Sequence, residues 1–224
     1  MQHTAEIRGV AFDIDGTLYP NGRMYRASLG IVLRHLRLFR AFGAARREIR
    51  SRRPVTDLRR ETAELTARRL GIDAQTAGSL IESVVYERWE RVLRRVPLFP
   101  GARDLLVELR ERNVPLAAMS DFPVTSKLHL LGLDGLWDVA FSSEELGYLK
   151  PNREPFEELA ARLALPPGEI LYVGNSYHYD VLGAGAVGFR TAHLPGTPAK
   201  PGKADVAVRS FAELRGWLLP RLAE

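Results

Sequence analysis

The chain has 224 residues, a net charge of +5 and no cysteine, and 46% of its residues are hydrophobic. Its apolar content is too high for a disordered chain, and the absence of cysteine excludes disulfides, thiolate metal sites and a cysteine nucleophile. The sequence shows neither a signal-peptide pattern nor an apolar run near the ~20 residues of a membrane span. We therefore expect a cytoplasmic protein with no membrane partner.

The first predicted strand, Gly9–Phe12, ends in a pair of acidic residues. Asp13 and Asp15 follow the strand one residue apart, and Gly16 comes next. A carboxylate beside a hydrophobic core is unfavourable unless charge or hydrogen bonds compensate it. The pair is therefore either a solvated turn at the end of the strand or part of a site that needs two acids.

Residues 20–97, called the helical block below, show helical patterns and no predicted strand. Apolar residues recur at helical spacing over Tyr25–Phe42, Thr56–Leu70 and Thr76–Leu93, and Gly71 marks the end of the second helix. The arginines crowd one part of the block and indicate either a solvated surface or a positive field that attracts phosphate-bearing substrates. They are Arg46, Arg47, Arg50, Arg52, Arg53, Arg59 and Arg60.

Beyond the block, strands alternate with helices. This alternation predicts an α/β fold with a Rossmann-like parallel sheet and helices on both faces, into which the all-helical block is inserted. The expected domains are a core of residues 1–19 and 98–224 and a helical domain of residues 20–97. The expected strands are Pro115–Met119, Val139–Ser142, Ile170–Val173, Phe189–His193 and Asp205–Val208. The expected helices are Ala102–Arg112, Thr125–Leu131, Glu154–Leu163, Tyr179–Ala186 and Ser210–Arg221, and Pro195–Lys203 is an expected loop.

The predicted strand ends carry further polar residues. In an open parallel sheet, ligands bind at the carboxyl ends of the strands. Ser120 and Asp121 follow the second strand, and Lys150 lies in the loop after the third. Asn175 follows the fourth strand, and Asp180 comes five residues later. These strand ends therefore gather acids, a hydroxyl, an amide and a lysine at one edge of the sheet.

The motifs DIDGT, Ser120, Lys150-Pro151 and GNSYHYD resemble, in order, the four motifs of the haloacid dehalogenase-like superfamily. The resemblance covers nearly the whole chain, and the helical block is similar to that superfamily's C1-type cap. It implies that the backbone carbonyl of Asp15 is a metal ligand. It also implies that the Ser120 hydroxyl and nearby backbone N–H groups hold the transferring phosphoryl oxygens.

The chemistry of the residues points to a phosphatase. Asp13 can attack phosphorus and form an aspartyl-phosphate, while Asp15 protonates the leaving oxygen and then deprotonates the attacking water. Lys150 is a compact cation that can neutralise the charge of the phosphate. The expected phosphate-binding residues are Ser120, Asp121 and Lys150. The expected cofactor is Mg²⁺, which favours hard oxygen ligands. The expected metal residues are Asp13, Asp15, Asn175 and Asp180.

Two positions depart from the usual motifs of the superfamily. The fourth motif usually begins Gly-Asp, but here Asn175 offers only a neutral amide oxygen, so the metal is expected to bind more weakly. The second motif has Asp121 where asparagine is usual. We therefore weigh two roles for Asp121: it restores the missing negative charge, or it caps the next helix. His178, in the same loop, is a weaker candidate for a catalytic base.

The expected substrate is a small phosphorylated metabolite, because a cap that closes over the site excludes water and suits a small ligand. The hinges would be Leu18–Gly22 and Val96–Gly101, and Tyr19, Asn21 and Arg23 are candidate substrate contacts. The alternatives are a metal-independent haloacid dehalogenase, a phosphomutase and a non-catalytic or nucleic-acid-binding protein. The acid–base residue Asp15 speaks against the dehalogenase, because a halide leaving group needs no proton. No nucleic-acid-binding motif is present, and the sequence does not indicate an oligomeric state.

Overall fold

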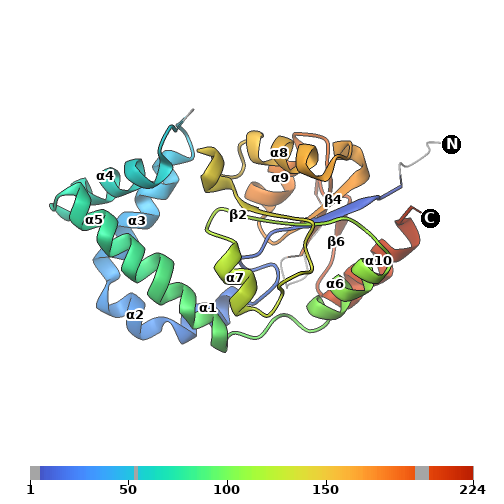
Figure 1. The fold of residues 1–224 in the computed structure, drawn as a ribbon, viewed down its shortest axis with the longest axis horizontal. Coiled ribbons are helices and arrows are strands. Elements are labelled where there is room, and N and C mark those ends of the chain that lie inside the picture. The colour runs from blue at the N-terminus through green and yellow to red at the C-terminus, as the bar shows by residue number, and fades with distance from the viewer. Residues whose placement is uncertain (1–5, 53–54, 195–201, 224) are drawn as a thin grey trace.

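One parallel six-stranded sheet forms the centre of the protein (Figure 1). The computed structural model describes residues 6–52, 55–194 and 202–223, and the strand order is β3-β2-β1-β4-β5-β6. The strands are β1 Gly9–Phe12, β2 Leu116–Ser120, β3 Val139–Ser142, β4 Ile170–Gly174, β5 Arg190–His193 and β6 Val206–Ala207. All six strands were predicted, with ends shifted by at most two residues. Ser120 is the last residue of β2 instead of following it.

Alternate residues of each central strand pack on opposite faces of the sheet. In β1, Val10 and Phe12 enter one hydrophobic cluster, whereas Ala11 enters the other. In β4, Val173 and Tyr172 divide between the same two clusters. Because both faces are buried, the strands are almost entirely apolar, as expected for a parallel sheet between helical layers. The predicted α/β fold is therefore confirmed.

Helices cover both faces of the sheet (Figure 1). Helices α6 (Ala102–Glu111) and α10 (Phe211–Leu218) pack on one face, and α8 (Glu154–Leu163) and α9 (Leu182–Gly185) pack on the other. The chain has further short helical segments, and residues 195–201 of the expected loop lie outside the described residues. These segments are α7 (Thr125–Leu130), η3 (Ser143–Leu146), η4 (Pro167–Glu169), η5 (Tyr177–Val181) and η6 (Leu219–Arg221).

The helical block lies beside the sheet, between β1 and β2 in the chain (Figure 1). Its elements are α1 (Asn21–Ala27), α2 (Leu29–Arg34), α3 (Leu36–Ile49), α4 (Leu58–Leu70), α5 (Ala74–Leu80), η1 (Ile81–Trp89) and η2 (Glu90–Arg95). The stretch Tyr25–Phe42 is helical as predicted, but it is divided among α1, α2 and α3 by breaks at Ser28 and His35. The Ser28 hydroxyl bonds to the carbonyl of Met24 at 2.8 Å, and such local bonds bend or interrupt helices.

Two connections join the block to the sheet, and buried polar contacts hold the block against it. The amide of Phe99 donates to the carbonyl of Leu18 at 2.9 Å, so the two connections run side by side. Farther away, Arg46 of α3 pairs with Glu144 of η3 at 2.8 Å, and both side chains are buried. Phe122, in the loop after β2, packs among the aromatic side chains of the block. In the described part of the chain, no helix is long and apolar enough to cross a membrane.

Candidate active site

The predicted site residues come together at the carboxyl ends of the central strands. A cavity of about 330 Å³ opens there, between the sheet and the helical block. Every predicted site residue but one lines it: Asp13, Asp15, Asp121, Lys150, Asn175 and Asp180. The remaining one, Ser120, does not line the cavity. Its hydroxyl donates a hydrogen bond at 2.5 Å to Asp15, which does. The parallel topology explains this convergence, because β1, β2 and β4 all end at the same edge of the sheet.

Lys150 lies between two buried carboxylates. Its Nζ is 2.7 Å from Oδ1 of Asp13 and 2.6 Å from Oδ1 of Asp180, and it also donates to the hydroxyl of Tyr172 at 3.2 Å. Burial lowers the pKa of Lys150, but the two carboxylates outweigh it and hold that pKa well above the usual value. Lys150 is therefore a fixed cation beside Asp13.

Asp13 is only partly compensated by this cation. Burial raises the pKa of Asp13 to about 7; Lys150 opposes the rise, and the charges of Asp180 and Asp15 add to it. Thr17 donates a hydrogen bond to the other oxygen, Oδ2 of Asp13, at 2.8 Å. One more positive charge near Asp13 would favour its ionised, nucleophilic form.

The position of Asp180 depends on a glycine. A Cβ atom on Gly174 would lie 2.3 Å from Cβ of Asp180 and 2.5 Å from its Oδ2, far inside van der Waals contact. That oxygen accepts a hydrogen bond from the amide of Ser176 at 2.9 Å. Gly174 thus lets the first turn after β4 fold back over the strand end and bring Asp180 toward Lys150.

Asp15 is held by three donors from two parts of the chain. Lys127 of α7 contacts its two oxygens at 2.7 and 2.6 Å, Ser120 donates at 2.5 Å, and Tyr19 donates at 2.5 Å. Burial raises the pKa of Asp15, but the bonds and charge of Lys127 prevail with help from Ser120 and Tyr19, so the pKa lies below its usual value. In this geometry Asp15 rests as a carboxylate, so it must take up a proton before it can protonate a leaving group.

Asp121 lines the cavity and accepts hydrogen bonds from groups around it. Arg50, the residue directly after α3, donates to its Oδ2 at 2.5 Å, while the hydroxyl of Ser143 and the backbone amide of Lys150 donate to its Oδ1 at 2.7 and 3.0 Å. Of the two roles that we weighed for Asp121, the cap on the next helix is not observed, and the contribution of its charge to the metal site stays a prediction. Its charge is matched by Arg50, and Val124, the N-cap of α7, makes no side-chain cap.

Asn175 lies beside the loop that carries Asp13. Its backbone N–H donates to the Thr17 hydroxyl at 3.0 Å, and that hydroxyl lies 3.5 Å from the side-chain Oδ1 of Asn175. A Cβ on Gly16, whose φ is +90°, would lie 2.4 Å from Nδ2 of Asn175, so this turn requires glycine. The side chains of Asp13, Asn175 and Asp180 offer hard oxygen atoms of the kind that Mg²⁺ prefers.

These donors fit a magnesium ion by their chemistry. No group of three histidine or acidic side chains within the described residues forms a ready metal cage. Asn175 lines the cavity with Asp13 and Asp180, and its side chain adds a neutral oxygen beside their carboxylates. Because burial and the neighbouring acids keep the pKa of Asp13 raised despite Lys150, a further cation would be electrostatically favoured here.

Of the remaining candidates from the sequence, two line the cavity and two do not. Asn21 and Tyr19 both line the cavity, and the Tyr19 hydroxyl donates a hydrogen bond to Asp15. Arg23 is exposed and is not among the lining residues, and His178 is exposed and packs on the ring of Tyr179.

Sequence reasoning missed Lys127 and Arg50. Lys127 is 5% exposed and follows Ser120 by seven residues, on a helix whose other buried residue is Leu128. Arg50 was counted with the arginine cluster, but its guanidinium lies over the ring of Tyr179 at 4.2 Å and lines the cavity. The only sequence signal for Lys127 is that a lysine stands at a helix position where an apolar residue is expected. The sequence holds no signal that separates Arg50 from the other arginines.

The acid pair at the end of β1 and the lysine facing it place the site at the carboxyl edge of the parallel sheet, where enzymes with an open α/β fold bind their ligands. The chain belongs to the haloacid dehalogenase-like hydrolase family, which it matches over residues 7–188. The resemblance inferred from the four motifs is thereby confirmed, and the protein is an enzyme of the HAD-like hydrolase type.

Characterised relatives cover most of the chain. It is 29% identical over 203 residues to a glyceraldehyde 3-phosphate phosphatase of Methanopyrus kandleri, covering 84% of each chain. It is 30% identical over 198 residues to a ribulose-1,5-bisphosphate 5-phosphatase of Halopiger xanaduensis, covering 81% of this chain and 82% of the relative. A solved 2-haloacid dehalogenase from Pseudomonas syringae has the same fold, with a TM-score of 0.68 and 24% identity over 97% of this chain and all of the other.

Proposed function

We propose that this protein is a Mg²⁺-dependent phosphatase that hydrolyses a small phosphorylated metabolite through an aspartyl-phosphate on Asp13. The observation that carries the proposal is the ammonium of Lys150, which lines the cavity and lies within 2.7 Å of both Asp13 and Asp180. This cation is placed to bind a phosphate oxygen beside the nucleophile. The two phosphatases that share about 30% identity with the chain support the same reaction class.

The reaction has two steps. A carboxylate oxygen of Asp13 attacks phosphorus, the bond between phosphorus and the ester oxygen breaks, and Asp15 gives that oxygen a proton. Asp15 then takes a proton from water, which attacks the same phosphorus and releases inorganic phosphate and free Asp13. Lys127, Ser120 and Tyr19 orient Asp15 for both proton transfers.

The metal residues remain those proposed from the sequence. Asp13, Asn175 and Asp180 would hold Mg²⁺ with side-chain oxygens, and Asp15 would hold it with its backbone carbonyl. The ion would offset the repulsion between an anionic nucleophile and an anionic substrate. Since Asn175 adds no charge, we expect weaker binding of the ion than an aspartate would give.

The helical block of residues 20–97 acts as a cap on a core of residues 1–19 and 98–224. Tyr25, Arg50 and Trp89 of the block line the cavity with the catalytic residues, so substrate selection falls to them. A cavity of about 330 Å³ lies at the lower end of the range for small-molecule sites, roughly 300–1,000 Å³, and suits a metabolite better than a phosphoprotein. We propose a cytoplasmic enzyme whose partner is this metabolite.

Turnover of p-nitrophenyl phosphate with and without Mg²⁺ tests the proposal. The protein should hydrolyse the ester only with the metal, and Asp13→Asn should abolish the activity. Asp134→Asn, at an exposed acid paired with His129, is the matched control and should leave the activity unchanged. Metal-independent chloride release from 2-chloropropionate would favour a dehalogenase instead, and inactivity toward a panel of phosphate esters would favour a non-catalytic protein.

A further inference from the structure

The helical block carries a second hollow that the catalytic site does not use. It has a volume of about 620 Å³ and shares no lining residue with the catalytic cavity. Residues of α1, α2, η1 and η2 line it. Five arginines line it: Arg34, Arg88, Arg91, Arg94 and Arg95.

Most of these guanidinium groups have no internal counter-charge. Arg91 pairs with Glu87 at 3.3 Å, but Arg34, Arg88, Arg94 and Arg95 make no ion pair within residues 6–52, 55–194 and 202–223. The helical block around the hollow also carries an excess of positive charge. Residues 20–97 contain 18 arginines, no lysine and eight acidic residues, a net charge of +10, so the rest of the chain is acidic overall. A hollow with this field attracts anions.

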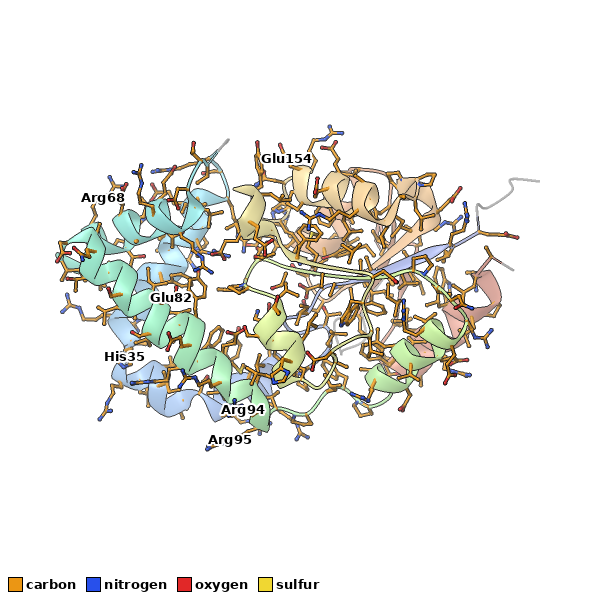
Figure 2. The ribbon with its side chains drawn as sticks, in the orientation of Figure 1. His35, Arg68, Glu82, Arg94, Arg95 and Glu154 are labelled. Carbon is orange, nitrogen blue, oxygen red and sulfur yellow. The ribbon has the colours of Figure 1, made fainter. Side chains whose placement is uncertain are left out.

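The inner wall of the hollow differs from its rim. The five arginines are exposed, whereas Ile31 and Val92 are half-buried. His35 adds a polar atom to the wall, because its buried Nε2 has no hydrogen-bond partner among the described residues. A ligand that fits this hollow would carry several negative charges for the arginines, an apolar body for Ile31 and Val92, and a polar atom for His35. Figure 2 shows His35, Arg94 and Arg95 in the lower part of the block.

We propose that this hollow binds a small organic polyphosphate, such as a nucleoside triphosphate, as a second site. The phosphates would contact the guanidinium groups, and the base would lie against Ile31 and Val92 with a ring nitrogen near His35. The concave shape and a volume within the range of small-molecule sites favour a small ligand over a nucleic acid or a membrane surface. The proposal stands apart from the phosphatase reaction, since it uses none of the catalytic residues.

Calorimetric titration with β,γ-methylene ATP, which resists hydrolysis at its terminal phosphate, tests the proposal. Binding to the unaltered protein should weaken with added salt, and Arg94→Gln combined with Arg95→Gln should reduce affinity about tenfold. Arg68→Gln is the matched control, because Arg68 is an arginine of the same block that lies in its upper part, on α4 (Figure 2). An affinity that is unchanged in the double variant, or that falls equally in Arg68→Gln, would overturn the proposal.

A second pair of variants tests the same site without removing arginines. Gly30 lines the hollow, and a Cβ on it would meet nothing within 4 Å, so Gly30→Glu places a carboxylate there without a clash. It should abolish nucleotide binding, while Gly216→Glu, at an equally open glycine of α10, should not. Binding of single-stranded RNA at these positions, but not of the nucleotide, would overturn the proposal in favour of a nucleic-acid surface.

Discussion

Replacing Arg46 by methionine should be the most destabilising single change at the contact between the helical block and the sheet. The side chains of Arg46 and Glu144 are 5% and 4% exposed and lie 2.8 Å apart. Removing one partner of a buried ion pair costs about 3–5 kcal/mol, because the other charge stays buried. Glu144 would keep the hydroxyl of Tyr86 at 2.7 Å and the exposed Arg59 at 3.6 Å. We therefore expect the lower end of that range, about 3 kcal/mol.

Urea unfolding measures this cost, and a second variant isolates its cause. Arg46→Met combined with Glu144→Met removes both charges, so it should be less destabilising than Arg46→Met alone. Arg60→Met breaks an exposed pair with Glu64 in the same block and should change the free energy of unfolding by less than about 0.5 kcal/mol. A cost below about 1 kcal/mol for Arg46→Met, or strictly additive effects in the double variant, would refute the reasoning.

Three further outcomes are expected. Asn175→Asp should lower the Mg²⁺ concentration needed for half-maximal activity, because a carboxylate replaces a neutral amide; an unchanged midpoint would remove Asn175 from the metal site. Lys127→Met should raise the pKa of Asp15, so the limb of the pH–rate profile that reports Asp15 should move to higher pH. Burial raises the pKa of Asp121, but Arg50 and other cations hold it below the usual value. The stability that Asp121 adds is thus complete above about pH 4 and lost below it, and Asp121→Asn should flatten this part of the acid-unfolding curve.

The sheet and the catalytic strand ends could be predicted because local pattern determines them. Buried parallel strands are continuous apolar runs, and the residues that follow them must meet at one edge, so Asp13 and Lys150 could be placed together from the sequence. The helical block was harder. Helical periodicity continues through Ser28 and His35, and the breaks there come from side-chain bonds and backbone angles that the pattern does not show.

The partners of individual site residues could not be predicted at all. Whether Asp121 faces the metal or an arginine depends on how α3 packs against the loop after β2. Arg50 is separated from Asp121 by 71 positions, and it stands in a run of arginines that look alike in the sequence. Lys127 reaches Asp15 across 112 positions. Contacts of this kind follow from tertiary packing, which overrides local preference.

Trapping the covalent intermediate tests the central claim most directly. The variant Asp15→Asn should still accept the phosphoryl group of p-nitrophenyl phosphate, whose leaving group needs no proton, but should release it slowly. Acid quenching, borohydride reduction and peptide mass spectrometry should then find homoserine in place of aspartate at position 13, and only after incubation with substrate and Mg²⁺. Homoserine at another acidic residue, or unmodified Asp13 in a variant that still releases p-nitrophenol, would contradict the assignment of Asp13 as the nucleophile.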